Sequence, residues 1–165
     1  KNDVWSTADG KTWTRATADA GWAPRGYHQA AVLGDRIYVF GGGNYVPEYK
    51  AFNDVWSSTD GVHWQQVTKA APWHPRLWFS SVVYRQHMWV LGGWSNKPSK
   101  NWGDAWYSRD GKTWTEYKTR TTWKARHEHS AYVLGEKLWI AGGHARPLCS
   151  EVWSLSLPRN WPNSP

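Results

Sequence analysis

The segment His127-Glu128-His129 carries the residue types in this chain that are best suited to chemistry. On a strand, residues two apart share a face, so His127 and His129 would present two imidazoles to a metal ion. His129 also occupies the repeat position of His28, where a packed histidine explains it better, and no metal site is predicted. Glu128 with Arg126 is the main acid–base candidate, because a positioned carboxyl beside a cation can move a proton.

The rest of the chain offers little catalytic chemistry. No nucleophile–base pair or phosphate-binding loop stands out, and no cofactor is predicted. The single cysteine, Cys149, has no intrachain partner. There is no apolar run of membrane-spanning length and no charged-then-apolar start typical of a secretory signal. The formal net charge is +7, but the basic residues are scattered, so a nucleic-acid partner is not predicted.

The elements that must position these residues come from an internal repeat of about 50 residues. The stretch at residues 53–64, with sequence NDVWSSTDGVHW, returns in similar form upstream and downstream. Its first tryptophan recurs at Trp5, Trp56 and Trp106, and in a shortened copy at Trp153. A repeat that spans the whole chain indicates one repeated structural unit, not a series of unrelated elements.

Each repeat predicts four antiparallel strands. Asp60-Gly61 is typical of a two-residue hairpin turn, with the next strand over residues 63–68. The apolar runs at residues 37–40, 88–91 and 138–141 predict strands covered on both faces. Nothing shows a helical period. The chain contains 16 tryptophans, and side chains of this size fill the interfaces between sheets.

These features resemble the kelch-repeat β-propeller family. The resemblance is carried by the pairs Gly41-Gly42, Gly92-Gly93 and Gly142-Gly143, by the aromatic residue about a dozen positions later, and by the Pro-Arg-x-x-His pattern at residues 24–28. The Asp-Gly-x-x-Trp turns also resemble the Asp-box hairpins of sialidase-like propellers, although Asp and Gly are adjacent here. The family resemblance slightly favours an extracytoplasmic location, periplasmic or secreted.

The resemblance implies an all-β propeller portion over residues 1–157, with repeats near 2–52, 53–102 and 103–157 and an irregular tail at 158–165. Counting strands gives two, four, four and three, which is about three four-stranded blades. Closed propellers typically have about four to eight blades. We therefore expect the chain to be part of a larger ring of about six blades. Either another copy of the chain or the missing part of the propeller would close that ring.

Successive connections in such a blade alternate between two rims. Short turns such as Gly34-Asp35 fall on one rim, and long, irregular loops fall on the other. Long loops on a rigid scaffold usually carry binding. The candidate binding residues in these loops are Tyr45, Trp94, Trp102, His144 and Arg146, and the loops also hold Tyr49.

Three repeated arginines, Arg25, Arg76 and Arg126, are expected at the mouth of the central channel, where their guanidiniums would grip carboxylates. The alternative is architectural: each arginine pairs with a carbonyl or an acid of the neighbouring blade. The repeated tryptophans at positions 22, 73 and 123 are expected to pack between sheets.

The predicted function is a binding module that recognises a protein loop or a glycan at the long-loop rim. Some bacterial kelch proteins are sialic-acid mutarotases, so the resemblance implies a sugar-modifying enzyme as one alternative, with Arg126 and Glu128 as its acid–base pair. A purely structural assembly scaffold is the other. The sequence favours the non-catalytic module.

Overall fold

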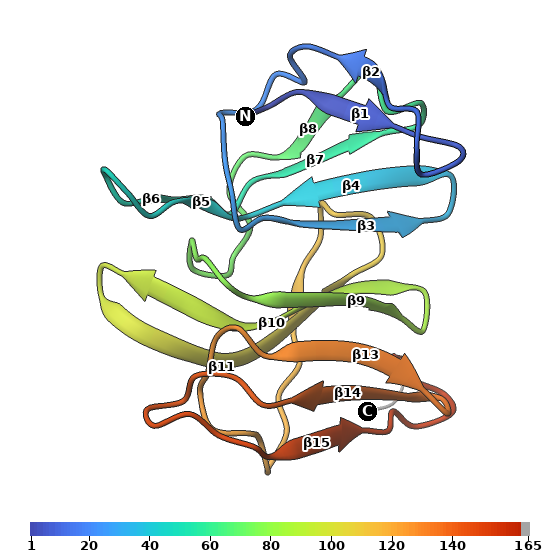
Figure 1. Ribbon diagram of the computed structural model, residues 1–165. Coiled ribbons are helices and arrows are strands. Elements are labelled where there is room, and N and C mark those ends of the chain that lie inside the picture. The colour runs from blue at the N-terminus through green and yellow to red at the C-terminus, as the bar shows by residue number, and fades with distance from the viewer. Residues whose placement is uncertain (163–165) are drawn as a thin grey trace.

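The computed structural model describes residues 1–162, which form 15 strands arranged as a row of antiparallel sheets (Figure 1). The first blade contains β1 (Val4–Ser6) and β2 (Thr14–Thr17). The second contains β3 (Gln29–Leu33), β4 (Arg36–Phe40), β7 (Val55–Ser58) and β8 (Gln65–Thr68). The third contains β9 (Ser80–Tyr84), β10 (His87–Asn96), β11 (Ser99–Ser108) and β12 (Thr115–Glu116). The fourth contains β13 (Ser130–Leu134), β14 (Lys137–Ala141) and β15 (Val152–Leu155). A two-stranded ribbon, β5 (Gly43–Asn44) with β6 (Lys50–Ala51), projects beside the second blade.

This arrangement confirms the prediction of an all-β fold made of propeller blades. The innermost strand β9 contacts both β3 and β13, so the second, third and fourth blades stand side by side (Figure 1). The three apolar runs form β4, the first half of β10, and β14. Residues 88–91 of β10 are fully buried, because both faces of that strand are covered by neighbouring sheets.

Large aromatic side chains fill the interface between the second and third blades. Trp73 is 1% exposed and packs edge-on against Trp114, with ring centroids 5.9 Å apart. Phe40 and Phe79 complete this cluster. Each buried aromatic side chain removes roughly 150–250 Å² of surface from water, so these few residues provide much of the hydrophobic stabilisation between the two blades. Trp73 and its counterparts therefore pack as the repeat predicts.

A tryptophan near the end of the chain packs against the third blade. Trp161 follows Trp153 at the spacing that separates Trp106 from Trp114, and it stacks on Trp89 at 5.6 Å between ring centroids. Sequence reasoning treated residues 158–165 as an irregular tail and missed this packing, although the spacing was visible. Residues 163–165 lie outside the described residues.

The Asp-Gly turns are wider than predicted. The connection from β7 to β8 spans residues 59–64, so the prediction of a two-residue turn was wrong and β8 begins at Gln65. The Asp60 carboxylate accepts the backbone N–H groups of Val62 and His63, both at 2.8 Å, and the Trp64 indole N–H donates to the Gly61 carbonyl at 3.0 Å. An aspartate side chain that binds backbone amides two and three residues ahead stabilises an open loop instead of a tight turn.

We expect Asp110→Ala to destabilise the protein by about 1–2 kcal/mol. Asp110 Oδ1 accepts the backbone N–H groups of Lys112 and Thr113, both at 2.8 Å. Burial opposes ionisation of Asp110, but these bonds hold its pKa below the usual range. Urea unfolding measures the change. Asp35→Ala is the control, because the Asp35 side chain is 85% exposed, and a loss as large in that variant would contradict the assignment.

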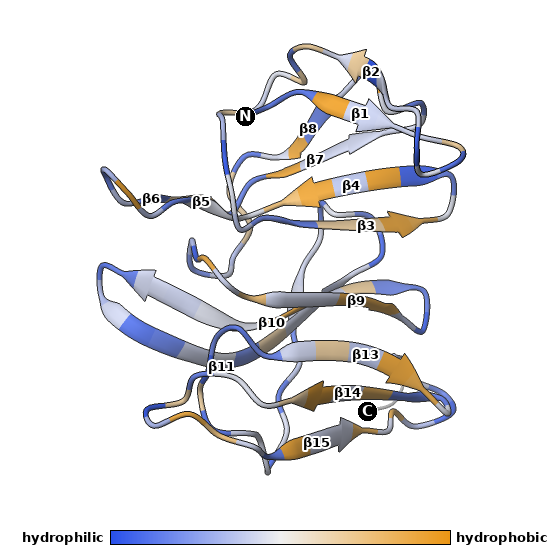
Figure 2. Cartoon of the chain, in the orientation of Figure 1, coloured by the Kyte–Doolittle hydropathy of each residue, from blue (hydrophilic) through white to orange (hydrophobic). Residues whose placement is uncertain are grey.

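The outward faces of the two end blades are apolar and exposed. Trp5 and Trp13 in the first blade are 48% and 56% exposed. In the fourth blade Tyr132, Leu134 and Val152 are 40%, 65% and 57% exposed, and hydrophobic segments are visible along β13 and β15 (Figure 2). Exposed sheet faces and open strand edges of this kind favour association with another sheet.

Candidate functional site

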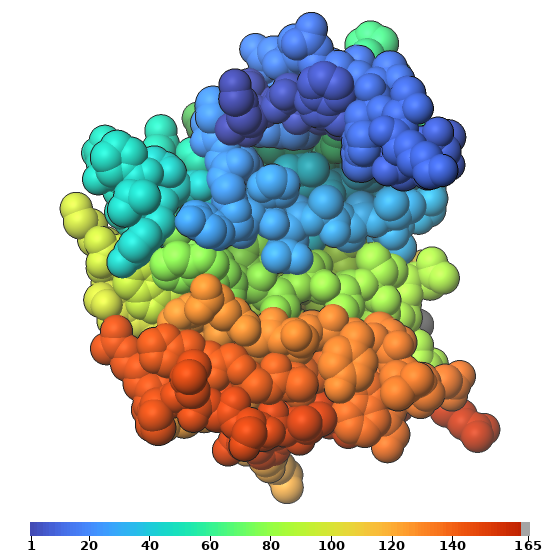
Figure 3. Space-filling model, viewed as in Figure 1, coloured from blue at the N-terminus to red at the C-terminus, as the bar shows by residue number. Residues whose placement is uncertain are grey.

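The long loops gather on one rim of the blades. The hairpin turns after β3, β9 and β13 lie together on the opposite rim, at the right of Figure 1. Three projecting loops, residues 43–51, 94–101 and 144–149, extend from the second, third and fourth blades at the left. In the space-filling view the first two lie against each other (Figure 3). We call this side the long-loop rim.

A connected group of rings covers the base of these projecting loops. We call it the aromatic surface and define it as Tyr27, Tyr45, Trp78, Trp94 and His127. Trp78 is at its centre, with ring centroids 5.3 Å from Tyr27, 5.1 Å from Tyr45 and 5.3 Å from Trp94. The His127 ring stacks on Trp78 at 5.4 Å. Tyr27 and Tyr45 are 47% and 44% exposed, so the surface is open to solvent.

Strained backbone supports this surface at one repeated position. Tyr27, Trp78 and Glu128 have φ angles of 56°, 55° and 54°, in the left-handed region that residues other than glycine seldom adopt. Each lies two residues before the innermost strand of its blade. Left-handed residues of this kind cluster at binding and active sites. Sequence reasoning missed Tyr27 and Trp78, and the signal that points to them is a repeat position whose residue type changes from blade to blade.

The structure divides the predicted binding residues into two groups. Tyr45 and Trp94 belong to the aromatic surface, and the His144 ring lies 4.9 Å from His127. Trp102 lies to the side, stacked on His74 at 4.8 Å, while Arg146 is exposed at the tip of its loop. A further rim residue, Tyr49, contacts Trp94 with ring centroids 5.7 Å apart.

The three repeated arginines are fully buried and already paired. Arg76 makes two hydrogen bonds to the Asp104 carboxylate, at 2.5 and 2.9 Å, and donates to the Gly92 carbonyl at 2.8 Å. Arg25 also makes two hydrogen bonds to the carboxylate of Asp54, whereas Arg126 makes one to Oε2 of Glu151. All three guanidinium side chains are 0% exposed.

This pairing has the architectural form that was the alternative to ligand binding, with one correction. The acid comes from the same blade and not from the neighbouring one. In each pair the acid also accepts an indole N–H from the tryptophan two residues later, as Asp104 does from Trp106 at 2.8 Å. We call this unit the Arg–acid–Trp clasp. The clasps account for the position of all three arginines without a ligand, and a ligand-binding role for them stays a prediction.

The proposed acid–base pair of Arg126 and Glu128 is not formed. Glu128 is 58% exposed and lies 3.7 Å from Nε2 of His127, whereas Arg126 is bound to Glu151. The left-handed φ of Glu128 breaks the strand alternation that would place His127 and His129 on the same face. His127 Nδ1 is 2.8 Å from Oδ1 of Asn101, and burial lowers the pKa of His127.

His129 is buried at the base of the rim, and neither of its ring nitrogens has a hydrogen-bond partner. Burial, reinforced by the nearby Arg126 cation, lowers the pKa of His129 to about 4. The equivalent residue of the third blade is Phe79, so this position packs a ring against the paired glycines of the preceding blade. In the described residues no group of three or more His, Cys, Asp or Glu side chains is placed to hold a metal ion.

We expect wild-type stability to fall by about 2 kcal/mol between pH 7 and pH 5 because of His129. The unfolded chain takes up a proton near pH 6.5, whereas the folded chain does so only near pH 4. The native state therefore loses stability as pH falls through this window. His129→Phe is expected to remove this part of the slope, as measured by urea unfolding at each pH. An unchanged slope in the variant would contradict the assignment.

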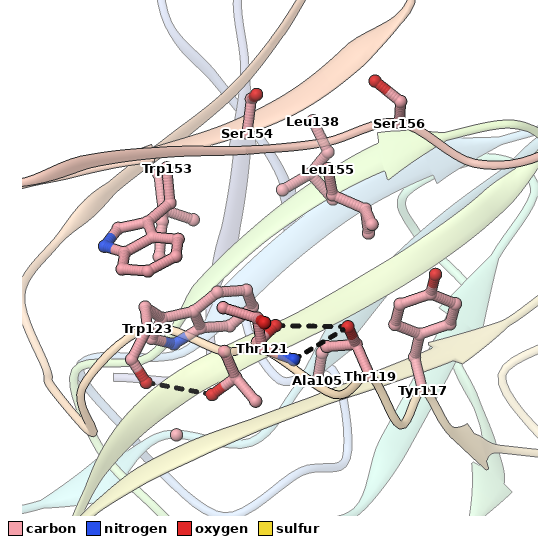
Figure 4. Close-up of a pocket in the computed structure, with 13 residues that line it drawn as sticks. Ala105, Tyr117, Thr119, Thr121, Trp123, Leu138, Trp153, Ser154, Leu155 and Ser156 are labelled. Carbon is pink, nitrogen blue, oxygen red and sulfur yellow. Dashed lines mark hydrogen bonds between the residues drawn. The ribbon is translucent and has the colours of Figure 1, made fainter.

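A cavity of about 410 Å³ lies between the third and fourth blades, away from the aromatic surface. The indoles of Trp123 and Trp153 form two of its walls, with Leu138 and Leu155 beside them (Figure 4). At the equivalent position between the second and third blades, Val55 belongs to the buried core and Asn53 anchors the Trp73 loop by two hydrogen bonds. Between the third and fourth blades the smaller residues Ala105 and Gly103 take these two places and line the cavity.

Comparisons with known proteins agree with this geometry. The chain matches the KLHDC2/KLHL20/DRC7 Kelch-repeats domain over residues 1–163. Over 91 residues, 50% of this chain, it is 32% identical to the flagellar outer arm dynein alpha chain of Chlamydomonas reinhardtii. That match covers 2% of the dynein chain, so the sequence corresponds to a small part of this relative. The described residues contain no helix of the length and apolarity that a membrane crossing requires.

Proposed function

The chain belongs to the kelch-repeat family, and on this basis we propose that it binds a polypeptide segment on the aromatic surface of its long-loop rim. As a kelch-repeat domain it is a protein-interaction module. The observation that carries the finer proposal is the cluster around Trp78, in which four rings contact one strained, half-buried indole. Tryptophan and tyrosine anchors of this kind supply most of the affinity in protein interfaces.

The position of the cluster supports this proposal. It joins residues from the second, third and fourth blades, so a bound segment contacts several blades of a rigid scaffold at once. On the opposite rim the connections after β3, β9 and β13 are two-residue turns, which offer less surface for recognition than the projecting loops. The exposed rings of Tyr27 and Tyr45 rest on the buried Trp94 and His127, and such a pre-ordered cluster binds a partner at a low cost in conformational entropy.

Mapping with indole N–H resonances tests the binding surface. Peptides are first selected from a random 12-residue library on the immobilised chain. The selected peptide is then titrated into ¹⁵N-labelled protein. We expect the indole signals of Trp78 and Trp94 to shift, whereas those of Trp13 and Trp139 stay in place. Shifts confined to Trp13 or Trp139 would contradict the proposal.

A glycan ligand and a mutarotase-like activity stay predictions from the sequence. The contact between Glu128 and His127 offers a carboxylate beside an imidazole, but the Arg126 cation expected by that hypothesis is bound to Glu151. Addition of free sialic acid, followed by an anomer-exchange measurement, tests both. Absence of rate enhancement would remove the mutarotase-like activity, and absence of binding would remove free sialic acid as a ligand.

We also propose that the outward faces of the first and fourth blades are covered by further blades, supplied by another copy of the chain or by the rest of a propeller. Exposed Trp5, Trp13 and Leu134 support this, because apolar sheet faces of this kind are normally buried. Light scattering coupled to size exclusion tests it. A stable monomer over a wide concentration range would remove the self-association option.

A further inference from the structure

We propose that the segment bound by the aromatic surface is acidic, and that its carboxylates pair with the cations of the three projecting loops. This rests on the proposed function and specifies its partner. The projecting loops carry Lys50, Lys97, Lys100 and Arg146 against the single carboxylate of Glu48. All four cationic residues are exposed.

The cations form one field because the projecting loops touch each other. Tyr45 and Tyr49 of the first loop both contact Trp94 of the second, with ring centroids 5.9 and 5.7 Å apart. Asn101 of the second loop donates to the carbonyl of His144 in the third, at 2.9 Å. A segment that lies across the three loops therefore meets cations along its length and rings at their base.

Three acids that belong to this rim are already used, whereas Glu48 and Glu128 stay exposed there beside the four cations. Asp54, Asp104 and Glu151 are held in the Arg–acid–Trp clasps, where each neutralises a buried arginine. Two ammonium groups of the projecting loops sit over rings instead. Lys100 Nζ is 4.5 Å from the centroid of Trp102, and Lys50 Nζ is 5.4 Å from that of Phe52. This placement orients each ammonium group and leaves its N–H donors for a ligand.

The opposite rim has a different charge pattern. Lys11 and Lys112 each lie two residues after an aspartate of the Asp-Gly turns, Asp9 and Asp110. Both lysines are exposed, so they provide matched controls of the same residue type on the other side of the molecule.

An acidic polypeptide fits this field better than a nucleic acid. The cations are spread over three loop tips, and none of these loops contains a run of basic residues. Binding along a phosphate backbone normally uses a dense stripe of cations. An aromatic centre with scattered cations around it suits a peptide that carries one large apolar side chain between acidic residues.

The test reads the charge of the peptides selected on the wild-type chain. We expect them to be enriched in Asp and Glu relative to the unselected library, around at least one aromatic or large apolar residue.

One enriched peptide is then measured by fluorescence anisotropy and stopped flow. Lys97→Glu/Lys100→Glu is expected to slow association by about tenfold and to weaken the salt dependence, because the steering field is removed. Lys11→Glu/Lys112→Glu, with the same change in net charge, is expected to leave both unchanged.

The outcomes separate the two proposals. Peptides that lose binding in Trp78→Ala but show no excess of acidic residues would overturn the acidic partner and leave the proposed function standing. Equal losses in the two charge-reversal variants would also overturn it. A library that yields no peptide dependent on Trp78 would overturn the proposed function itself. A single-stranded (dT)₁₂ probe that binds more tightly than every selected peptide would replace the acidic polypeptide with a nucleic acid.

Discussion

Arg76→Ala is expected to lower the free energy of unfolding by about 3–5 kcal/mol. The substitution removes a fully buried guanidinium and leaves Asp104 without its main partner. Burial alone raises the pKa of Asp104, and Arg76 lowers it below the usual value, so the carboxylate would lose its compensating charge in the variant. Urea unfolding followed by circular dichroism measures the loss.

Two comparisons make this result specific to the buried clasp. Arg36→Ala is the matched control. Arg36 is 43% exposed, and its ion pair with the exposed Asp35 is long, at 4.0 Å. We therefore expect its removal to change the free energy of unfolding by at most about 1 kcal/mol. Arg76→Met/Asp104→Leu removes both charges and is expected to recover part of the loss. A change for Arg76→Ala no larger than for Arg36→Ala would contradict the structural role. If Arg76→Ala remains folded and selectively loses the partner, the arginine takes part in binding after all.

Trp78→Ala is expected to weaken the selected peptide by at least about 100-fold, or roughly 3 kcal/mol. The indole is the common neighbour of Tyr27, Tyr45, Trp94 and His127, so its removal breaks the aromatic surface at its centre. Isothermal titration calorimetry measures the affinity.

Two variants separate binding from folding in this prediction. Trp13→Ala, which removes a 56% exposed indole from the first blade, is expected to leave the affinity unchanged. Trp78→Gly accommodates the left-handed φ of 55° at less strain, of order 1 kcal/mol, and serves if the alanine variant folds poorly. Wild-type affinity in a folded Trp78 variant would contradict the proposed surface.

The blades were predictable because their signal is repeated. The four-residue apolar runs, the paired glycines and the spacing of Trp5, Trp56 and Trp106 each occur several times, so the overall period outweighs errors at single positions. Local turn geometry was less accessible. The loop at Asp60 is opened by side-chain hydrogen bonds to Val62 and His63, which a residue pair alone does not specify.

The candidate site was predicted only in part. Tyr45, Trp94 and His144 lie where the long loops were expected to carry binding residues. Trp78 was missed because its place at the centre of the surface depends on a backbone angle that composition does not reveal. The extension of two strands was also missed. β10 runs on to Asn96 and β11 already begins at Ser99, on either side of a stretch with Pro98 whose proline and polar residues predict a loop.

The three projecting loops belong to three different blades, which otherwise meet mainly through their packed faces. A partner bound across all of them would hold the three blades together, so the stability of the folded chain would rise with the fraction of chains that carry the partner. At a partner concentration 100 times the dissociation constant, mass action adds about 2.7 kcal/mol against unfolding. Resistance to a protease would then report whether the partner is present, even when its identity is unknown.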